Sequence, residues 1–253
     1  MIQGIIFDLG WTLMYNDGKF KENEAQAIAR LVEFLHANGT LVGDDFPERF
    51  HAARERGWKL ADESGIERPG VQALQETLAH YGYTNLDGLL PRANDVFFGE
   101  LGRQWLAYPD AVGTLQVLHQ RGLSVGVISN ADDVALVHNQ VANLGFAPYL
   151  NPVISSASEP RWRKPDPRVF HLVSTAWNIA PENIAFVGDS PRFATLGAHR
   201  AGMRAILIDH EENYWWQKIP DGLANEPAIQ PDIIVRSLAD IPAALTSASL
   251  TGK

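Results

Sequence analysis

The stretch that decides the fold is residues 4–13, which read GIIFDLGWTL. Residues 4–7 form a short apolar run that stops at Asp8, a pattern typical of a strand buried on both faces of a parallel sheet. A residue directly after such a strand lies at the sheet edge where ligands bind in open α/β folds. An Asp in this place is also a common turn or capping residue, so its meaning depends on the residues at the ends of the other strands.

From residue 109 onward, short apolar runs alternate with helical patterns. We expect strands at 123–128, 152–154, 184–187, 204–208 and 233–235, helices at 111–121, 133–144, 166–177 and 193–201, and a last element at 238–245. Asp166 and Pro167 are typical of the cap and first position of a helix. Strands that alternate with helices form right-handed β-α-β units, which predicts an α/β fold with a Rossmann-like parallel sheet.

Residues 15–106 show a different pattern of apolar residues, with helical periodicity. Four helical patterns occupy 22–37, 47–62, 71–81 and 86–101, and few residues between them favour a strand. A structureless insertion of this length would be unusual. We therefore predict a smaller, all-helical cap domain at 15–106, inserted into a core domain formed by residues 1–14 and 107–253.

Composition excludes several classes of function. The chain has 253 residues, a formal net charge of −9 and no cysteine. The missing cysteines exclude disulfides, thiolate metal sites and a cysteine nucleophile. The acidic balance disfavours binding to nucleic acids or anionic membranes. The apolar runs are too short for a signal peptide or a membrane span, which predicts a cytoplasmic protein.

Four segments place reactive side chains after predicted strands or just before helices. They are residues 8–12, Ser129 with Asn130, Lys164, and residues 188–190, which read Gly-Asp-Ser. Each segment alone has an ordinary structural explanation. Together they supply two carboxylates, a cation, a hydroxyl and helix-start N–H groups at one sheet edge. These are the groups that enzymes use to bind and transfer a phosphoryl group.

These segments resemble the haloacid dehalogenase superfamily of phosphohydrolases, in the branch with a helical cap inserted after the first strand. The resemblance is most specific over residues 5–13, 125–130, 163–170 and 185–203, and nothing in the cap matches a motif. It implies that Asp8 is the nucleophile and takes the phosphoryl group as an aspartyl-phosphate. It implies the remaining roles as well: Ser129 and Asn130 bind the phosphate, Lys164 neutralises Asp8 and the phosphate, Thr12 steadies the loop by hydrogen bonding, and Asp8, Asp189 and the Gly10 carbonyl hold Mg²⁺.

Two positions depart from the family pattern. Gly10 stands where the phosphatases usually carry a second Asp, the general acid/base, and Ala194 stands where an outer Asp usually supports the metal. Loss of a positioned acid/base typically costs about 10²–10⁴-fold in rate. Loss of a residue that hydrogen-bonds to a metal ligand costs about 10–100-fold in metal affinity or activity.

The sequence predicts a Mg²⁺-dependent phosphatase of a small phosphorylated metabolite, acting as a monomer or homodimer. One alternative is a metal-independent 2-haloacid dehalogenase, which uses the same Asp nucleophile but does not usually carry an acid like Asp189. Another is a non-catalytic binding protein with a decayed site, which Gly10 and Ala194 would explain. The retained Asp8, Ser129, Lys164 and Asp189 argue against that second alternative.

Aromatic and basic residues outside the motifs are further candidates. Arg54 and Trp58 share a helix face, with His51 close by. They could meet a phosphate or a ring-shaped substrate, or belong to a solvated helix with one buried Trp. Trp162 with its neighbours Arg161 and Arg163, and residues 214–216, Tyr-Trp-Trp, could contact a partner or the cap, or pack under loops.

Overall fold

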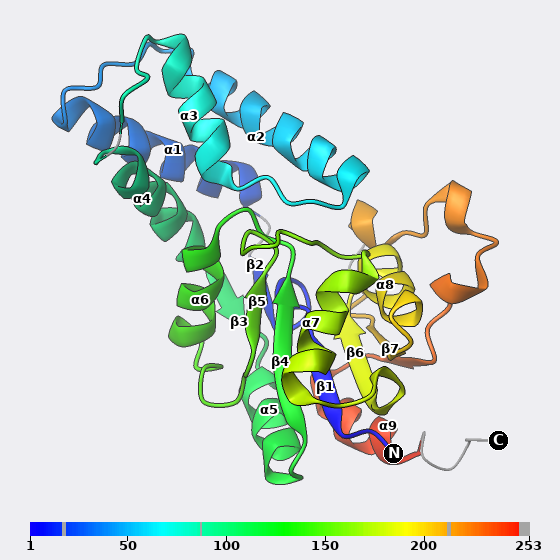
Figure 1. Ribbon diagram of the computed structural model, residues 1–253. Helices are drawn as coiled ribbons and strands as arrows, with labels where there is room; N and C mark the ends of the chain where they lie inside the picture. The colour runs from blue at the N-terminus through cyan, green and yellow to red at the C-terminus, as the bar shows by residue number, and fades with distance from the viewer. Residues whose placement is uncertain (17–18, 87, 212–213, 248–253) are drawn as a thin grey trace.

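A computed structural model of the chain describes residues 1–16, 19–86, 88–211 and 214–247. Its centre is a six-stranded parallel sheet, in the lower half of Figure 1. In spatial order the strands are β5 (Val153–Ser155), β4 (Ser124–Ser129), β1 (Gly4–Phe7), β6 (Ile184–Gly188), β7 (Arg204–Ile208) and β8 (Ile233–Val235). The predicted α/β fold with a parallel Rossmann-like sheet is confirmed, and β1, which precedes Asp8, lies near its middle.

Helices cover both faces of the sheet because successive strand residues point to opposite sides. Ile5 and Phe7 pack toward α5 (Ala111–Gln120), α6 (Val134–Asn143) and α9 (Ile241–Ser247). Ile6 packs on the other face, toward α7 (Pro167–Trp177) and α8 (Leu196–Arg200). The continuous apolar runs in the sequence are therefore explained by burial on two faces.

The predicted helix at 193–201 differs in the structure. The chain first makes a π-helical turn over Pro191–Thr195 and then continues as α8. The Ser190 carbonyl accepts hydrogen bonds from the N–H groups of both Ala194 and Thr195, at 2.9 and 3.3 Å. Pro191 begins the turn because a first helical position needs no N–H donor. The helical segment thus starts two residues before the predicted one.

Four helices stand apart from the sheet, at the upper left of Figure 1. They are α1 (Phe20–Ala37), α2 (Phe46–Ser64), α3 (Gly70–His80) and α4 (Leu90–Gly102). They bury their own apolar cluster, which includes Leu31, Phe50 and Phe97. The fourth begins later than predicted because Pro91 at its start favours initiation there. None of the helices among the described residues is both long and apolar enough to cross a membrane.

Two short strands join the helical layer to the sheet layer. β2 (Met14–Asn16) pairs antiparallel with β3 (Trp105–Ala107), so the chain leaves and re-enters the sheet layer side by side. The sequence does not predict these strands, because three residues are too few to show an alternating pattern. The predicted boundaries at 14/15 and 106/107 fall inside this pair, and the division into two domains stays a prediction.

Candidate active site

Asp8 and Lys164 form an ion pair at the carboxyl edge of the sheet, in which Lys164 is buried and Asp8 is partly buried. Asp8 follows β1 and is fixed by its backbone N–H, which donates to Val187 O at 2.8 Å. Lys164 Nζ lies 2.6 Å from Asp8 Oδ1 and also donates to Ile128 O at 2.9 Å. Burial of the Lys164 ammonium lowers its pKa, and the negative charge of Asp8 opposes that shift. The pair places a carboxylate and a cation side by side at this edge.

Asn130 holds Lys164 in place. Its side-chain amide donates to Lys164 O and accepts from Lys164 N, both at 2.9 Å. The two bonds fix the backbone of Lys164 against the end of β4. The amide is therefore engaged with the protein, and the structure gives Asn130 a positioning contact in addition to its predicted role in phosphate binding, which stays a prediction.

Ser129 and Thr12 differ in how they fit their predicted roles. Ser129 ends β4 and is buried beside the carbonyl that binds Lys164, so it lies at the predicted edge. Thr12 is fully buried, but its hydroxyl has no hydrogen-bond partner among the described residues. Thr12 takes part in closing the loop through its backbone, since its N–H donates to Leu9 O at 3.4 Å, and its wider role stays a prediction. The loop is also closed by backbone bonds in which Leu13 and Met14 donate to Leu9 O at 2.9 and 3.1 Å.

Asp189 follows β6, the strand next to β1, and is 5% exposed. Burial, and then the negative charge of Asp8, raise its pKa to about 7. Trp216 Nε1 and Gln217 Nε2 donate to its Oδ2 at 2.9 and 3.2 Å, which opposes the shift. Within the described part of the chain, no cationic side chain forms an ion pair with this carboxylate.

Aromatic rings surround the loop after β1. Trp11 takes a left-handed backbone conformation, with φ of 58°, which costs about 1–2 kcal/mol outside glycine. Its ring lies between Tyr214 and Trp105, with centroid distances of 4.4 and 5.6 Å. A Cβ added to Gly10 would come 3.4 Å from the Trp105 ring. Apolar ring surface therefore stands where a side chain at position 10 would begin.

Ala194 offers no support to a metal. It is 2% exposed and packs in the apolar cluster with Phe170 and Phe186. Its Cβ also lies 2.5 Å from where a Cβ on Gly188 would stand, so β6 and the π-helical turn are in close contact. The position at which the resemblance places an outer carboxylate is therefore occupied by an apolar residue of the core.

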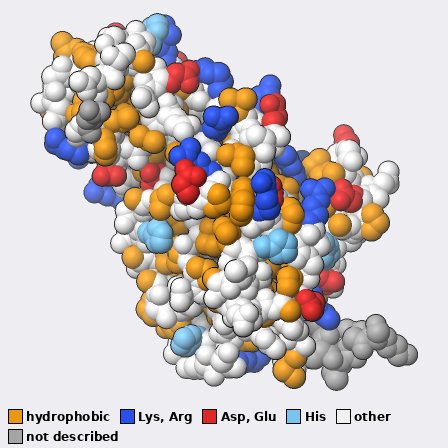
Figure 2. Space-filling view, in the orientation of Figure 1, with side chains coloured by type: hydrophobic (Ala, Val, Ile, Leu, Met, Phe, Trp, Pro, Cys, Tyr) orange, Lys and Arg blue, Asp and Glu red, His pale blue; other side chains and the backbone are white. Residues whose placement is uncertain are grey.

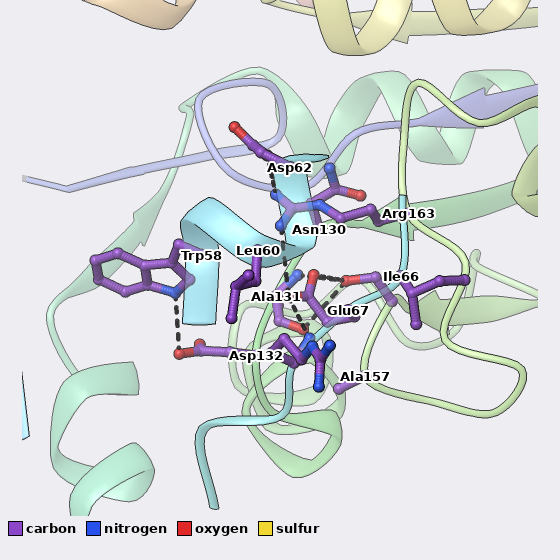
Figure 3. Close-up of polar contacts among 12 residues, drawn as sticks. Trp58, Leu60, Asp62, Ile66, Glu67, Asn130, Ala131, Asp132, Ala157 and Arg163 are labelled. Atoms are coloured by element: carbon purple, nitrogen blue, oxygen red, sulfur yellow. Dashed lines mark hydrogen bonds and ion pairs between the residues drawn. The ribbon is translucent and has the colours of Figure 1, made fainter. Parts of the chain in front are cut away.

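Arg54 joins the helical layer to the sheet layer. It is buried in α2 and its guanidinium pairs with Glu24 Oε1 at 2.5 Å and Asp132 Oδ2 at 3.1 Å. Trp58 Nε1 donates to the same Asp132 oxygen at 3.3 Å, and Figure 3 shows the two side chains facing each other. His51 binds Glu24 and Glu55. The two carboxylates on Arg54 make these residues a junction between the layers, a role that the sequence did not predict, and the contact with a phosphate or a ring-shaped substrate stays a prediction.

A second set of contacts crosses the same junction. Arg163 forms ion pairs with Asp62 at 3.1 Å and with Glu67 at 3.5 Å, and Figure 3 shows the three side chains together. Glu67 also accepts from Ser156 Oγ at 2.6 Å, and burial raises its pKa. A bridge between Ile66 and Trp162 adds backbone pairing. Figure 2 shows acidic and basic side chains mixed along this junction. Of the alternatives that the sequence left open for Trp162 and Arg163, the structure thus shows contact with the segment between α2 and α3.

Sequence reasoning missed part of the site. Tyr214 and Trp216 are half-buried over Asp8's loop rather than exposed, and the side chain of Trp215 lies outside what the structure describes. Gln217 was not a candidate, although it binds Asp189. Neither Trp105 nor Phe20 was singled out, although their rings pack with Trp11. A cluster of aromatic residues at both ends of the inserted segment was the available signal.

Comparisons with known proteins agree on one family. Residues 2–202 match the haloacid dehalogenase-like hydrolases. A phosphoserine phosphatase from Thermus thermophilus is 30% identical over 197 residues, which is 76% of this chain and 74% of that protein. A phosphoglycolate phosphatase from Escherichia coli (strain K12) is 30% identical over 158 residues, which is 62% of this chain and 58% of that protein.

A solved structure extends the similarity to the whole fold. The crystal structure of a 2-haloacid dehalogenase from Pseudomonas syringae pv. tomato superposes with a TM-score of 0.73 and 25% sequence identity. The superposition covers 98% of this chain and 100% of that one. It therefore includes the helical layer, where the sequence showed no motif.

Proposed function

Because this chain belongs to the haloacid dehalogenase-like hydrolases, we propose that it is a Mg²⁺-dependent phosphatase acting through an aspartyl-phosphate on Asp8. Its substrate is a small phosphorylated metabolite. The single observation that carries the proposal is the 2.6 Å contact between Lys164 Nζ and Asp8 Oδ1, beside a second buried acid. Relatives named as phosphatases of phosphoserine and phosphoglycolate support the same reaction.

The reaction has two displacement steps. A carboxylate oxygen of Asp8 attacks phosphorus, and the bond from phosphorus to the leaving-group oxygen breaks. Lys164 balances negative charge on the transferring group, and the leaving oxygen takes a proton from water. A second water then attacks the phosphorus of the aspartyl-phosphate and gives its proton to the hydroxide that the first water became. The bond to Asp8 breaks, its carboxylate is restored, and inorganic phosphate leaves.

The donor set fits a hard divalent cation. Among the described residues, no group of three or more His, Cys, Asp or Glu side chains is arranged to hold a metal. Mg²⁺ does not need such a group, because it is usually bound by one or two carboxylates with water and substrate oxygens. Asp8, Asp189 and the Gly10 carbonyl would hold the ion. When bound, it supplies positive charge to the phosphoryl oxygens.

The position of Gly10 limits the chemistry to substrates that need little acid help. No carboxyl stands at this position, and the Trp105 ring lies 3.4 Å from where its Cβ would be. Water, rather than a protein acid, therefore supplies the proton to the leaving group. This predicts faster turnover for activated aryl phosphates than for alkyl phosphates.

A second candidate is metal-independent hydrolysis of a 2-haloacid. The similarity to the Pseudomonas syringae dehalogenase favours it, as does the apolar surface beside Gly10. Against it stands Asp189, a buried acid without a cation partner among the described residues, for which a halide displacement has no use.

The test is a panel of phosphate esters, including phosphoserine, phosphoglycolate and an aryl phosphate, assayed with Mg²⁺ and with a chelator. A 2-haloacid is assayed in parallel for halide release, and Asp8→Asn serves as the matched inactive control. Phosphate release that requires Mg²⁺ and Asp8 supports the proposal. Halide release without metal and without phosphate release selects the dehalogenase. No activity on any substrate selects a non-catalytic protein.

A further inference from the structure

The carboxylate of Asp189 is held on one side by two neutral donors. Trp216 Nε1 and Gln217 Nε2 reach the same atom, Oδ2, at 2.9 and 3.2 Å. Within the described residues, no hydrogen bond reaches Oδ1. The carboxylate therefore has one oxygen fixed by the protein and one available to a further ligand.

The segment that carries these donors is itself anchored. Ser190 Oγ donates to Trp216 O at 2.7 Å, which ties the segment to the residue after Asp189. Tyr214 N donates to Gln217 Oε1 at 3.0 Å, and because only the oxygen can accept that bond, the amide nitrogen must face Asp189. The Trp216 and Tyr214 rings stack at 4.5 Å with an interplanar angle of 4°. The donors are thus oriented before any ligand arrives.

Metal-binding carboxylates usually need such outer partners, whose loss costs about 10–100-fold in metal affinity or activity. The family pattern usually places this outer partner at the position of Ala194. Ala194 is buried in apolar packing and has no polar side-chain atom, so it cannot support the carboxylate. Trp216 and Gln217 come from a different segment but reach the same carboxylate.

We propose that Trp216 and Gln217 are positioning residues for the metal site: they fix Oδ2 of Asp189 so that Oδ1 faces Mg²⁺. The inference rests on the proposed function, since it concerns the ion used by that reaction. It assigns the role of outer support to an indole N–H and an amide in place of a carboxylate. Neutral donors stabilise the ionised form of Asp189 without adding negative charge beside Asp8.

The test is Mg²⁺ binding measured by isothermal titration calorimetry, without substrate. Trp216→Phe keeps a ring for the stack with Tyr214 but removes the N–H, and Gln217→Met keeps the side-chain length but removes the amide. Each variant is expected to raise the Mg²⁺ dissociation constant about 10-fold, the low end for outer partners. The KM for substrate at saturating Mg²⁺ should stay near the wild-type value.

Trp177→Phe is the matched control, because Trp177 Nε1 donates to Asn151 O and its ring packs against Gly4 and Gly126 at the opposite strand ends. It should leave Mg²⁺ affinity unchanged. Wild-type affinity in both Trp216→Phe and Gln217→Met would overturn the inference. Tighter Mg²⁺ binding in those variants would also overturn it, since the donors would then compete with the ion. If the unchanged protein bound no Mg²⁺, the proposed function would fall and the inference with it.

Discussion

The junction between the helical layer and the sheet contrasts with the sheet edge around Asp8 and Asp189, although both places gather acidic side chains. At the junction, each of Glu24, Asp62, Glu67 and Asp132 has an arginine partner. At the edge, Asp8 has Lys164, whereas the partners of the Asp189 carboxylate among the described residues are the neutral donors Trp216 and Gln217. The two regions therefore differ in whether an acid is neutralised by an arginine or held by neutral donors, and our proposal assigns the second kind to a metal ion.

The largest expected effect comes from removing the nucleophile. Asp8→Asn keeps an oxygen that can accept from Lys164 Nζ, so the protein should fold. A carboxamide is a poor nucleophile, and loss of a nucleophile typically lowers kcat by roughly 10⁴-fold or more. Phosphate release is measured in the presence of Mg²⁺. Wild-type turnover in a folded Asp8→Asn protein would exclude the covalent mechanism.

At the junction, the expected loss is in stability. Arg54→Met removes the cation that Glu24 and Asp132 share, and leaving buried charges unpaired costs about 3–5 kcal/mol in the free energy of unfolding. The matched control is Arg56→Met on the same helix, whose ion pair with Glu76 is exposed and is worth about 0–1 kcal/mol. Urea unfolding measures the free energy of unfolding of both variants. An equal decrease in the two would mean that the Arg54 ion pairs stabilise the protein no more than an exposed ion pair does. The Mg²⁺ affinity of folded Arg54→Met should remain unchanged.

Gly10→Asp should add the acid that the edge lacks, with a gain of up to ~10²-fold for alkyl phosphates and little for aryl phosphates. Gly10 does not have a positive φ, so its backbone accepts a side chain. Trp105, rather than Trp11, crowds the new group, because its outer ring atoms are 3.4–3.5 Å from the added Cβ. Trp105→Phe removes those atoms, so the double variant should exceed the single one. For each variant, the rate relative to wild type is compared between an alkyl and an aryl phosphate. Equal ratios for the two substrates, in both the single and the double variant, would show that no missing acid limits the reaction.

The smallest effect is a pH dependence at the junction. Because burial raises the pKa of Glu67, the unfolded chain ionises this acid near 4.5, before the folded protein does. The free energy of unfolding should therefore fall as pH rises from about 4.5 toward the folded pKa. Glu67→Gln should remove that part of the slope, whereas Glu63→Gln, at an exposed position on α2, should not. Parallel stability–pH curves for wild type and Glu67→Gln would contradict the assignment.

Much of the edge was predictable from the sequence. A parallel sheet brings the carboxyl ends of its strands to one side, so Asp8, Ser129 and Asp189 could be placed together from their positions after apolar runs. The family match over residues 2–202 confirms the resemblance. The roles of the individual residues stay predictions.

The partners of these residues were not predictable. Arg54 binds Glu24 and Asp132, which are 30 and 78 residues away, and no local pattern encodes such contacts. Trp216 and Gln217 lie in a segment of short turns without apolar periodicity, 27 and 28 residues after Asp189. Thr12 was expected to steady its loop by hydrogen bonding; the sequence could not show that its backbone N–H makes such a bond while its hydroxyl has no partner among the described residues.

The central claim is the proposal that Asp189, which has no cation partner among the described residues, holds Mg²⁺. Its most direct test is the Mg²⁺ dependence of phosphate release in wild type and Asp189→Ala. Removing this carboxylate leaves Asp8 and the Gly10 carbonyl as the protein's ligands. We predict that Asp189→Ala needs a much higher Mg²⁺ concentration for half-maximal rate, and that excess Mg²⁺ restores part of the rate. An unchanged Mg²⁺ dependence in the folded variant would contradict the claim and show that Asp189 is not a ligand.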